Sequence, residues 1–138
     1  MNRMWRTILA VAATSLLCLL ASCAAVNSQA RLAAQTRRGM RYLRGTGMPR
    51  HYPQALRLLA DAAAHGYAPA ENDLGLMYVH GYGVARDYAR AARLFRRAAA
   101  RGSYAADKNL GLLYRYGRGV TVNYSMASRL FAIAAAHG

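Results

Sequence analysis

The sequence is poor in acidic residues, lysine and cysteine, and these shortages limit the kinds of functional site that the protein can contain. Five Asp and Glu residues stand against 19 basic residues, of which only Lys108 is a lysine and the rest are arginines. With so few carboxylates, the chain has no evident acid and base pair, and no nucleophile stands beside a base. We therefore expect no catalytic residue, no metal site and no cofactor, and we predict that the protein is not an enzyme.

The few acidic and histidine residues do not form a recognisable site. Glu71 and Asp73 are two apart on a predicted helix and so point in different directions. The acidic residues, apart from one capping residue described below, are expected to be solvated charges of helix surfaces: Asp61, Glu71, Asp73 and Asp107. The four histidines have no metal-ligand spacing. Gly81-Tyr82-Gly83 lacks the third glycine of a dinucleotide-binding loop, so a phosphate cradle is also excluded.

The first 26 residues have the layout of an export signal. Arg3 and Arg6 are followed by Thr7 to Val26, a stretch with no charged residue. A short basic region before an apolar region is typical of a signal peptide. Of the two cysteines, Cys18 lies in the part of this segment before Cys23 that would be removed, so the mature protein would have no thiol pair and must fold without a disulfide.

The end of the apolar stretch resembles the lipobox of bacterial lipoproteins. Leu20-Ala21-Ser22-Cys23 has an apolar residue, two small residues and a cysteine. The resemblance implies cleavage before Cys23 and lipidation of Cys23, with residues 1–22 as the signal peptide and 23–29 as the lipidated cysteine and a short tether. Two alternatives remain open: an uncleaved membrane-spanning helix, since about 20 uncharged residues can cross a bilayer, and a signal cleaved at an ordinary small-residue site.

The rest of the chain repeats itself every 36 residues. Gly39, Gly75 and Gly111 are one set of equivalent positions, and Gly66, Gly102 and Gly138 are another. A period in this range marks a repeat architecture. The repeat-structural positions of the second and third copies are Gly75, Tyr78, Gly81, Gly83, Asp87, Ala91, Ala98, Gly102, Gly111, Tyr114, Gly117 and Gly119.

Each copy has the pattern of a helix, a glycine-rich turn and a second helix. Ala70, Leu74, Met77 and Tyr78 recur at helical spacing and predict one buried stripe. Glycine after this stripe accepts the positive φ of a helix C-terminus. Asp87 and its equivalent Asn123 are good N-caps for the second helix, whereas His51 in the first copy is expected to cap poorly.

These residues resemble the Sel1-like repeat, a relative of the tetratricopeptide repeat. The resemblance implies an all-α fold, an α-solenoid of three antiparallel helix pairs over 30–138, with repeats at about 32–67, 68–103 and 104–138. The first copy departs from the pattern, since Arg38 stands where Leu74 and Leu110 stand in the others. This departure places the packing of the first helix in question.

The positive charge restricts the partners. Removal of Arg3 and Arg6 leaves 17 basic and five acidic side chains, a formal charge of +12. Export argues against nucleic acid, so the charge points to anionic lipid, anionic polysaccharide or an acidic protein surface. Five arginines directly follow the tether and are expected either to rest near lipid head groups or to form a solvated helix face: Arg31, Arg37, Arg38, Arg41 and Arg44.

Solenoids bind partners on the surface formed by the first helix of each pair. The predicted partner-binding residues are the non-core positions Asn72, Leu76, Val79, Lys108, Leu112 and Arg115. The sequence has no polar capping helix after the third copy, so the side chains of Leu130, Ile133 and Ala134 are expected to be open and to allow self-association.

The sequence therefore predicts a lipid-anchored adaptor of the bacterial cell envelope that faces the periplasm and binds an envelope protein. Ala24 after Cys23 favours the outer membrane, because many lipoproteins retained at the inner membrane have Asp at that position. The alternative is a binding module for anionic glycan or peptidoglycan, which the many Arg and Tyr residues would allow.

Overall fold

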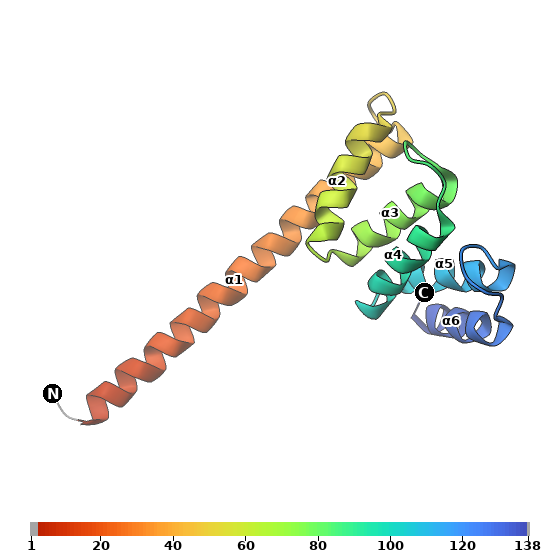
Figure 1. Ribbon diagram of the computed structural model, residues 1–138. Coiled ribbons are helices and arrows are strands. Elements are labelled where there is room, and N and C mark those ends of the chain that lie inside the picture. The colour runs from red at the N-terminus through yellow and green to blue at the C-terminus, as the bar shows by residue number, and fades with distance from the viewer. Residues whose placement is uncertain (1–2, 138) are drawn as a thin grey trace. The chain divides into compact units, whose positions relative to one another are not determined.

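The computed structural model describes residues 3–137, with side chains from residue 10 onward. Arg3 and Arg6 lack described side chains, and Gly138 lies outside the described residues. Within residues 3–137 all regular secondary structure is helical, without strands, which confirms the all-α prediction (Figure 1). The six helices are α1 (Arg3–Arg44), α2 (Tyr52–Ala64), α3 (Ala68–His80), α4 (Tyr88–Ala100), α5 (Tyr104–Tyr116) and α6 (Tyr124–His137).

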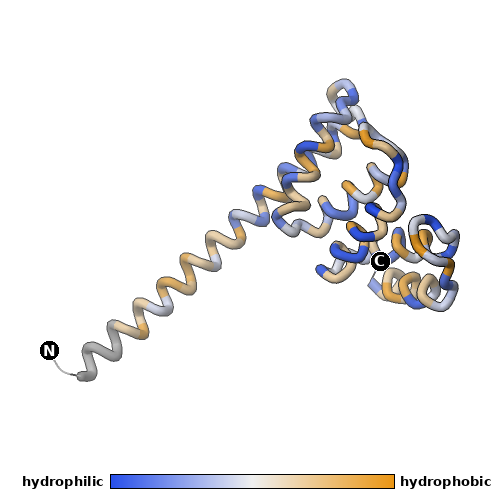
Figure 2. Tube along the Cα trace, in the orientation of Figure 1, coloured by the Kyte–Doolittle hydropathy of each residue, from blue (hydrophilic) through white to orange (hydrophobic). Residues whose placement is uncertain are grey.

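The chain divides into two units, Met1–Leu32 and Ala33–Gly138, and α1 contributes to both. In the first unit the helix is apolar over most of its length, as its colour in Figure 2 shows. The structure keeps residues 24–29 helical, where the sequence predicted a tether. This stretch, Ala24-Ala25-Val26-Asn27-Ser28-Gln29, contains neither Gly nor Pro, so nothing in it breaks the helix.

In the second unit, helices adjacent in the sequence pack against each other, from α2 with α3 through to α5 with α6. The final turns of α1 also contact α2, because the Gln35 side chain donates to the Leu58 carbonyl oxygen at 3.1 Å. Arg38 is exposed and so does not disturb this packing. The result is a chain of helix pairs, as a solenoid requires.

Local chemistry sets the ends of the helices. Gly81 and Gly117 end α3 and α5 in the left-handed conformation, with φ of 73° and 64°. Asp87 caps α4, because its Oδ1 accepts from the Arg90 backbone N–H at 2.8 Å. Asn123 accepts in the same way from the Met126 N–H.

The expectation that His51 caps poorly is wrong. His51 Nδ1 accepts from the Gln54 backbone N–H at 3.1 Å, so the imidazole serves where Asp87 and Asn123 serve in the other copies. A neutral imidazole has an unprotonated ring nitrogen that can accept, which is the reason for the difference.

In each helix pair, a glycine of the first helix packs against a large side chain of the second. A Cβ atom on Gly75 would lie 2.5 Å from Phe95, a residue with no exposed surface. Gly111 faces Phe131 and Gly39 faces Leu59 in the same manner, and these positions are again 36 residues apart. The repeated glycine therefore lets the first helix of each pair approach the second closely. Ala91 and Ala98 are fully buried beside Phe95 in the same core.

Consecutive repeats meet where a glycine turn lies against the start of the previous repeat's second helix. Gly83 packs on Tyr52, and Gly119 packs on the backbone of Tyr88. Tyr52 also stacks on the Tyr82 ring, with centroids 5.5 Å apart. The glycines are thus needed both for their positive φ and for the space they leave.

These two requirements can be separated by substitution. Gly119→Ala should destabilise the fold by more than about 2 kcal/mol, because Gly119 has a φ of 68° and its Cβ would overlap the backbone of Tyr88. Gly102→Ala is the matched control, since φ is 84° but no atom lies within 4 Å. It should cost only about 1–2 kcal/mol. Urea unfolding followed by circular dichroism would measure both, and equal losses would contradict the proposed close contact.

The expectation of an open face at Leu130, Ile133 and Ala134 is only partly correct. Leu130 is buried at 8% exposure, where it joins the core cluster with Leu110 and Leu113. Ile133 is 42% exposed and Ala134 is half-buried. Leu130 packs against α5 within its own repeat. The periodic pattern alone does not tell this side of α6 from the side that a further repeat would cover.

Candidate functional site

The structure divides the six predicted partner-binding residues into three groups. Leu76, Val79 and Leu112 line one groove between α3 and α5. Lys108 and Arg115 are exposed but do not line it. Asn72 was expected to be a surface contact residue, but it is buried at 7% exposure.

Asn72 is buried because it joins the two helices below the surface. Its Oδ1 accepts from Asn109 Nδ2 at 2.8 Å, and its own Nδ2 lies 3.4 Å from Asp73 Oδ1. A buried amide is costly unless it is hydrogen-bonded, and this arrangement satisfies it. Asn72 therefore holds α3 against α5 rather than facing a partner.

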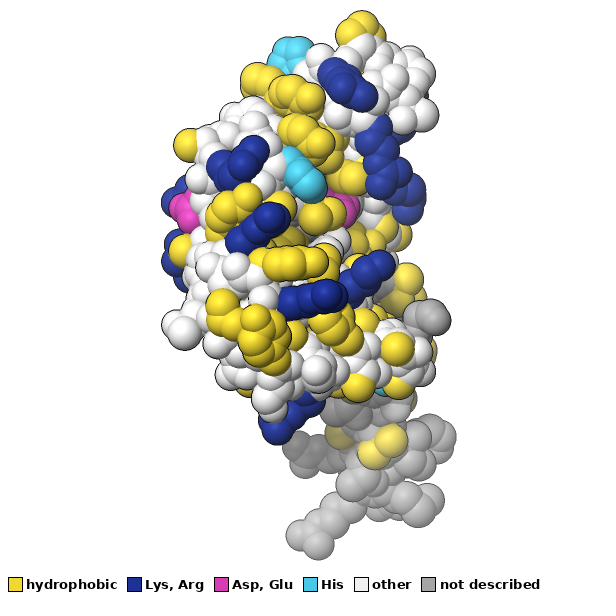
Figure 3. Space-filling view, turned by 90° about the vertical axis from the view of Figure 1, so that its right-hand side faces the viewer, with side chains coloured by type: hydrophobic (Ala, Val, Ile, Leu, Met, Phe, Trp, Pro, Cys, Tyr) yellow, Lys and Arg dark blue, Asp and Glu magenta, His cyan; other side chains and the backbone are white. Residues whose placement is uncertain are grey.

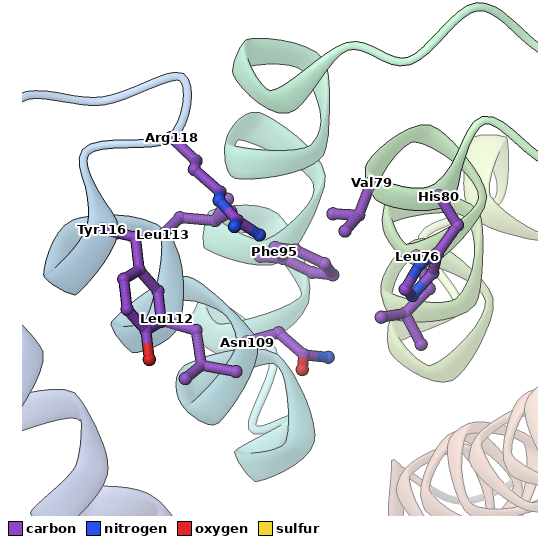
Figure 4. A pocket seen from close by; sticks show the side chains of 9 residues that line it. All are labelled: Leu76, Val79, His80, Phe95, Asn109, Leu112, Leu113, Tyr116 and Arg118. Carbon is purple, nitrogen blue, oxygen red and sulfur yellow. The ribbon is translucent and has the colours of Figure 1, made fainter.

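The groove has a volume of about 220 Å3 and a mostly apolar wall. Figure 4 shows Leu76, Val79 and His80 on α3 across from Leu112 and Tyr116 on α5. The lining residues are Leu76, Val79, His80, Phe95, Asn109, Leu112, Leu113, Tyr116 and Arg118. Apolar walls with a few polar groups at the rim are typical of a surface that binds a side chain or a short segment.

The polar groups at this groove are basic or neutral. Arg118 lies over the rings of Tyr88 and Tyr116, at 5.6 and 5.4 Å from their centroids. Stacking of this kind holds a guanidinium in place while leaving its charge available. His80 stacks on Tyr82 at 5.1 Å. No acidic side chain lines the groove.

A second depression, which we call the basic cleft, lies between the end of α1 and the start of α3. Its volume is about 490 Å3. Its lining includes three arginines and one carboxylate. The lining residues are Ala33, Thr36, Arg37, Met40, Arg41, Arg44, Thr46, Tyr67, Pro69 and Asp73. Burial raises the pKa of Asp73 above its ordinary value, while the Asn72 hydrogen bond and the Arg44 charge partly oppose the rise.

Glu71 is the largest departure from the sequence-based interpretation. It was expected to be a solvated helix charge, yet it has no exposed surface. Arg97 Nη2 lies 2.7 Å and Arg101 Nη1 3.3 Å from Glu71 Oε1, so Arg97 on α4 and Arg101 directly after α4 enclose one carboxylate of α3. Arg97 also donates to the Ala63 carbonyl oxygen at 3.3 Å, which ties α2 to the same cluster.

Asp107, the equivalent of Glu71 in the third copy, is also buried, so the expectation of a solvated charge is wrong there too. Burial raises the pKa of Asp107, and the charge of His137 partly opposes the rise. Two of the five acidic residues share one repeat position. The shared position is a sequence signal for a structural role that the pattern of a single helix does not show.

The other arginines beside the repeat tyrosines are engaged within the fold. Arg90 Nη1 donates to the Tyr78 hydroxyl at 3.0 Å, and Arg96 Nη2 donates to the Tyr114 hydroxyl at 3.2 Å. Figure 3 shows Lys and Arg side chains lying between hydrophobic ones on one face of the molecule. Among residues 10–137, no cluster of three His, Cys, Asp or Glu side chains could hold a metal ion.

One helix among the described residues, α1, is long and apolar enough over Ala10–Arg44 to cross a membrane. A signal sequence near the N-terminus meets the same criterion, so this helix indicates a signal or an anchor. Cys23 lies on it as an exposed free thiol.

Comparison with known proteins assigns the fold to a family. The Sel1 repeat model matches residues 28–67, 68–103 and 105–138. Among curated proteins, none matches the chain. Sel1 repeats form solenoids that generally mediate protein–protein interactions, and proteins built from them are typically non-catalytic scaffolds.

Two solved structures are similar to this chain. A protective antigen present in uropathogenic Escherichia coli strains, which displays an SLR fold, is 39% identical, with a TM-score of 0.73 over 78% of this chain and 23% of that protein. A Sel1 repeat protein from Oxalobacter formigenes is 32% identical, with a TM-score of 0.73 over 81% of this chain and 46% of that protein. The chain thus covers less than half the length of either. With three matched repeats over most of its length, it belongs to the Sel1 repeat family.

Proposed function

We propose that this protein is a lipid-anchored adaptor of the bacterial cell envelope, which holds a partner protein on the face formed by α3 and α5. The observation that carries the proposal is the open apolar groove at Leu76, Val79 and Leu112 on a repeat fold that generally binds proteins. Apolar side chains left open on a folded solenoid favour a docking surface.

The anchor is proposed from the sequence around Cys23. The lipobox-like Leu20-Ala21-Ser22-Cys23 lies at the end of the uncharged, apolar part of α1, and the thiol is exposed. Lipidation would leave residues 23–138 tethered at the membrane surface, facing the periplasm, and Ala24 favours the outer membrane. Contacts with an envelope protein would then take place close to the lipid surface.

Crosslinking in intact cells tests both parts of this proposal. The wild-type protein should incorporate a labelled fatty acid and give a discrete crosslinked product, whereas Cys23→Ser should incorporate none and leave the membrane fraction. A Cys23→Ser protein that remains labelled and membrane-bound would contradict the anchor.

The groove is tested by Leu112→Glu, which places a charge in an apolar wall. The crosslinked product should decrease at least tenfold, about the loss expected when a binding hot spot is removed. Arg57→Glu on exposed α2 surface is the control and should leave the product unchanged. Circular dichroism would verify that both variants fold. Unchanged crosslinking of Leu112→Glu would exclude the groove as the docking site.

A binding module for anionic glycan remains the second candidate, favoured by the basic cleft with its three arginines and Tyr67. Binding of a polysaccharide or muropeptide would then weaken steeply as salt concentration rises, because charge attraction would dominate it. Insensitivity of such binding to salt would count against this candidate.

A further inference from the structure

We propose that the partner segment recognised by this protein is acidic as well as apolar, and that it extends from the groove into the basic cleft. This inference rests on the proposed function, because it specifies the chemistry of the partner bound there. Three features of the second unit support it: the charge of the cleft, the lack of a close ion pair at its arginines, and the helix face that the cleft shares with the groove.

The cleft carries an excess of positive charge on one side. Arg37, Arg41 and Arg44 are at i, i+4 and i+7 on α1, so their side chains leave the same face of the helix. Asp73 is the only acidic residue lining the cleft, which leaves a net of two positive charges from three arginines and one carboxylate. A carboxylate-bearing ligand would complement this charge.

The arginines of the cleft are exposed and form no close ion pair, although the charge of Arg44 acts on Asp73 at longer range. Among residues 10–137, none of the three has an acidic group within ion-pair distance, and all three are exposed. Arg97 and Arg101, by contrast, are committed to buried Glu71. Guanidinium groups free of such pairs can form two parallel hydrogen bonds with an incoming carboxylate.

One face of α3 joins the cleft to the groove. Asp73, Leu76 and His80 lie at i, i+3 and i+7 on that helix. Asp73 lines the cleft, whereas Leu76 and His80 line the groove, as Figure 4 shows for the latter two. A 13-residue helix is about 20 Å long, so an extended segment of roughly six residues along it would reach both depressions.

This combination selects a protein segment over other anions. A glycan has no apolar side chains to fill the groove at Leu76, Val79 and Leu112. A peptide that places Leu-like side chains beside Asp or Glu satisfies both surfaces at once. The absence of acidic residues in the groove lining removes charge repulsion against such a ligand.

Peptide display on the full-length chain in detergent micelles tests the inference. Peptides selected from a random 12-residue phage library should be enriched in Asp and Glu next to apolar residues. The selected peptides would then be synthesised, together with versions in which Gln and Asn replace Glu and Asp, and their binding measured by fluorescence anisotropy. The acidic peptides should bind about tenfold more tightly than their amide versions.

Two triple variants locate the effect. Arg37→Gln/Arg41→Gln/Arg44→Gln should abolish the preference for acidic peptides and weaken their binding about tenfold or more. Arg57→Gln/Arg93→Gln/Arg129→Gln removes the same charge from exposed positions of α2, α4 and α6, and should change binding less than threefold. Equal losses in both triples would overturn the inference, because general charge rather than the cleft would explain them.

The remaining outcomes separate this inference from the proposed function. Selected peptides that lack acidic residues but lose binding in Leu112→Glu would overturn the acidic requirement and leave the docking groove intact. Peptides that bind Leu112→Glu and wild type equally would overturn the groove itself. Phosphatidylglycerol vesicles that compete with the peptides and need Arg37, Arg41 and Arg44 would assign the cleft to lipid head groups, and would also overturn the inference.

Discussion

Replacing Phe95 by alanine is expected to lower the free energy of unfolding by about 3–5 kcal/mol, the usual cost of removing a fully buried phenyl ring. Phe95 has no exposed surface and is the largest such side chain among the described residues. It packs with Ala91, Ala98 and Leu110 and lies directly over Gly75, so the cavity cannot be filled by a neighbouring side chain without moving a helix.

Phe131→Ala is the matched control for this prediction. It removes the same ring from the equivalent position of the third repeat, where the side chain is only half-buried. Its cost should be roughly half as large, since the loss scales with the apolar area buried. Domains of this size are stable by about 5–15 kcal/mol, so Phe95→Leu provides a milder variant if Phe95→Ala does not fold. Urea unfolding with equal losses for Phe95→Ala and Phe131→Ala would contradict the assigned core.

Removal of both arginines around Glu71 is expected to destabilise the protein by about 3 kcal/mol. Arg97→Met/Arg101→Met keeps the apolar stems but leaves a fully buried carboxylate without its cations. Breaking a buried ion pair from one side costs about 3–5 kcal/mol, and the lower end applies here because the arginine side chains are 51% and 45% exposed.

A third substitution identifies the cause of this loss. Addition of Glu71→Gln to the double variant should restore most of the stability, because the amide has no charge to leave unpaired. Arg57→Met/Arg93→Met, at exposed positions, should change stability by less than about 0.5 kcal/mol per residue. Thermal unfolding of wild type, the Arg97/Arg101 double variant, its Glu71→Gln derivative and the Arg57/Arg93 control would measure these differences in stability. An Arg97→Met/Arg101→Met protein as stable as wild type would refute the role of this cluster.

The fold could be predicted from the sequence because each repeat carries its own local signals. Gly81 and Asp87 determine the end of one helix and the start of the next through contacts within a few residues. The 36-residue period then places equivalent helices in equivalent positions. The short polar stretch at residues 24–29 suggested a tether, but the structure keeps it helical, since it contains neither Gly nor Pro.

The candidate site could be predicted only in part, because burial in a solenoid depends on the neighbouring repeat. Leu76, Val79 and Leu112 were identified from their non-core positions and line the groove. On a single helix, the sequence pattern predicts that Asn72 and Glu71 are both exposed. In the fold, Asn109, which follows 37 positions after Asn72, donates to it, and Arg101, which follows 30 positions after Glu71, binds its carboxylate. No pattern within one helix reports such contacts.

Site-specific photocrosslinking in living cells is the most direct test of the central claim that α3 and α5 form the docking surface. A photoreactive residue at Val79 or Leu112 should give one discrete crosslinked protein product, and the same residue at Arg57 or Arg129 should give none. Products from Arg57 or Arg129, with none from the two groove positions, would show that partners bind elsewhere on the solenoid.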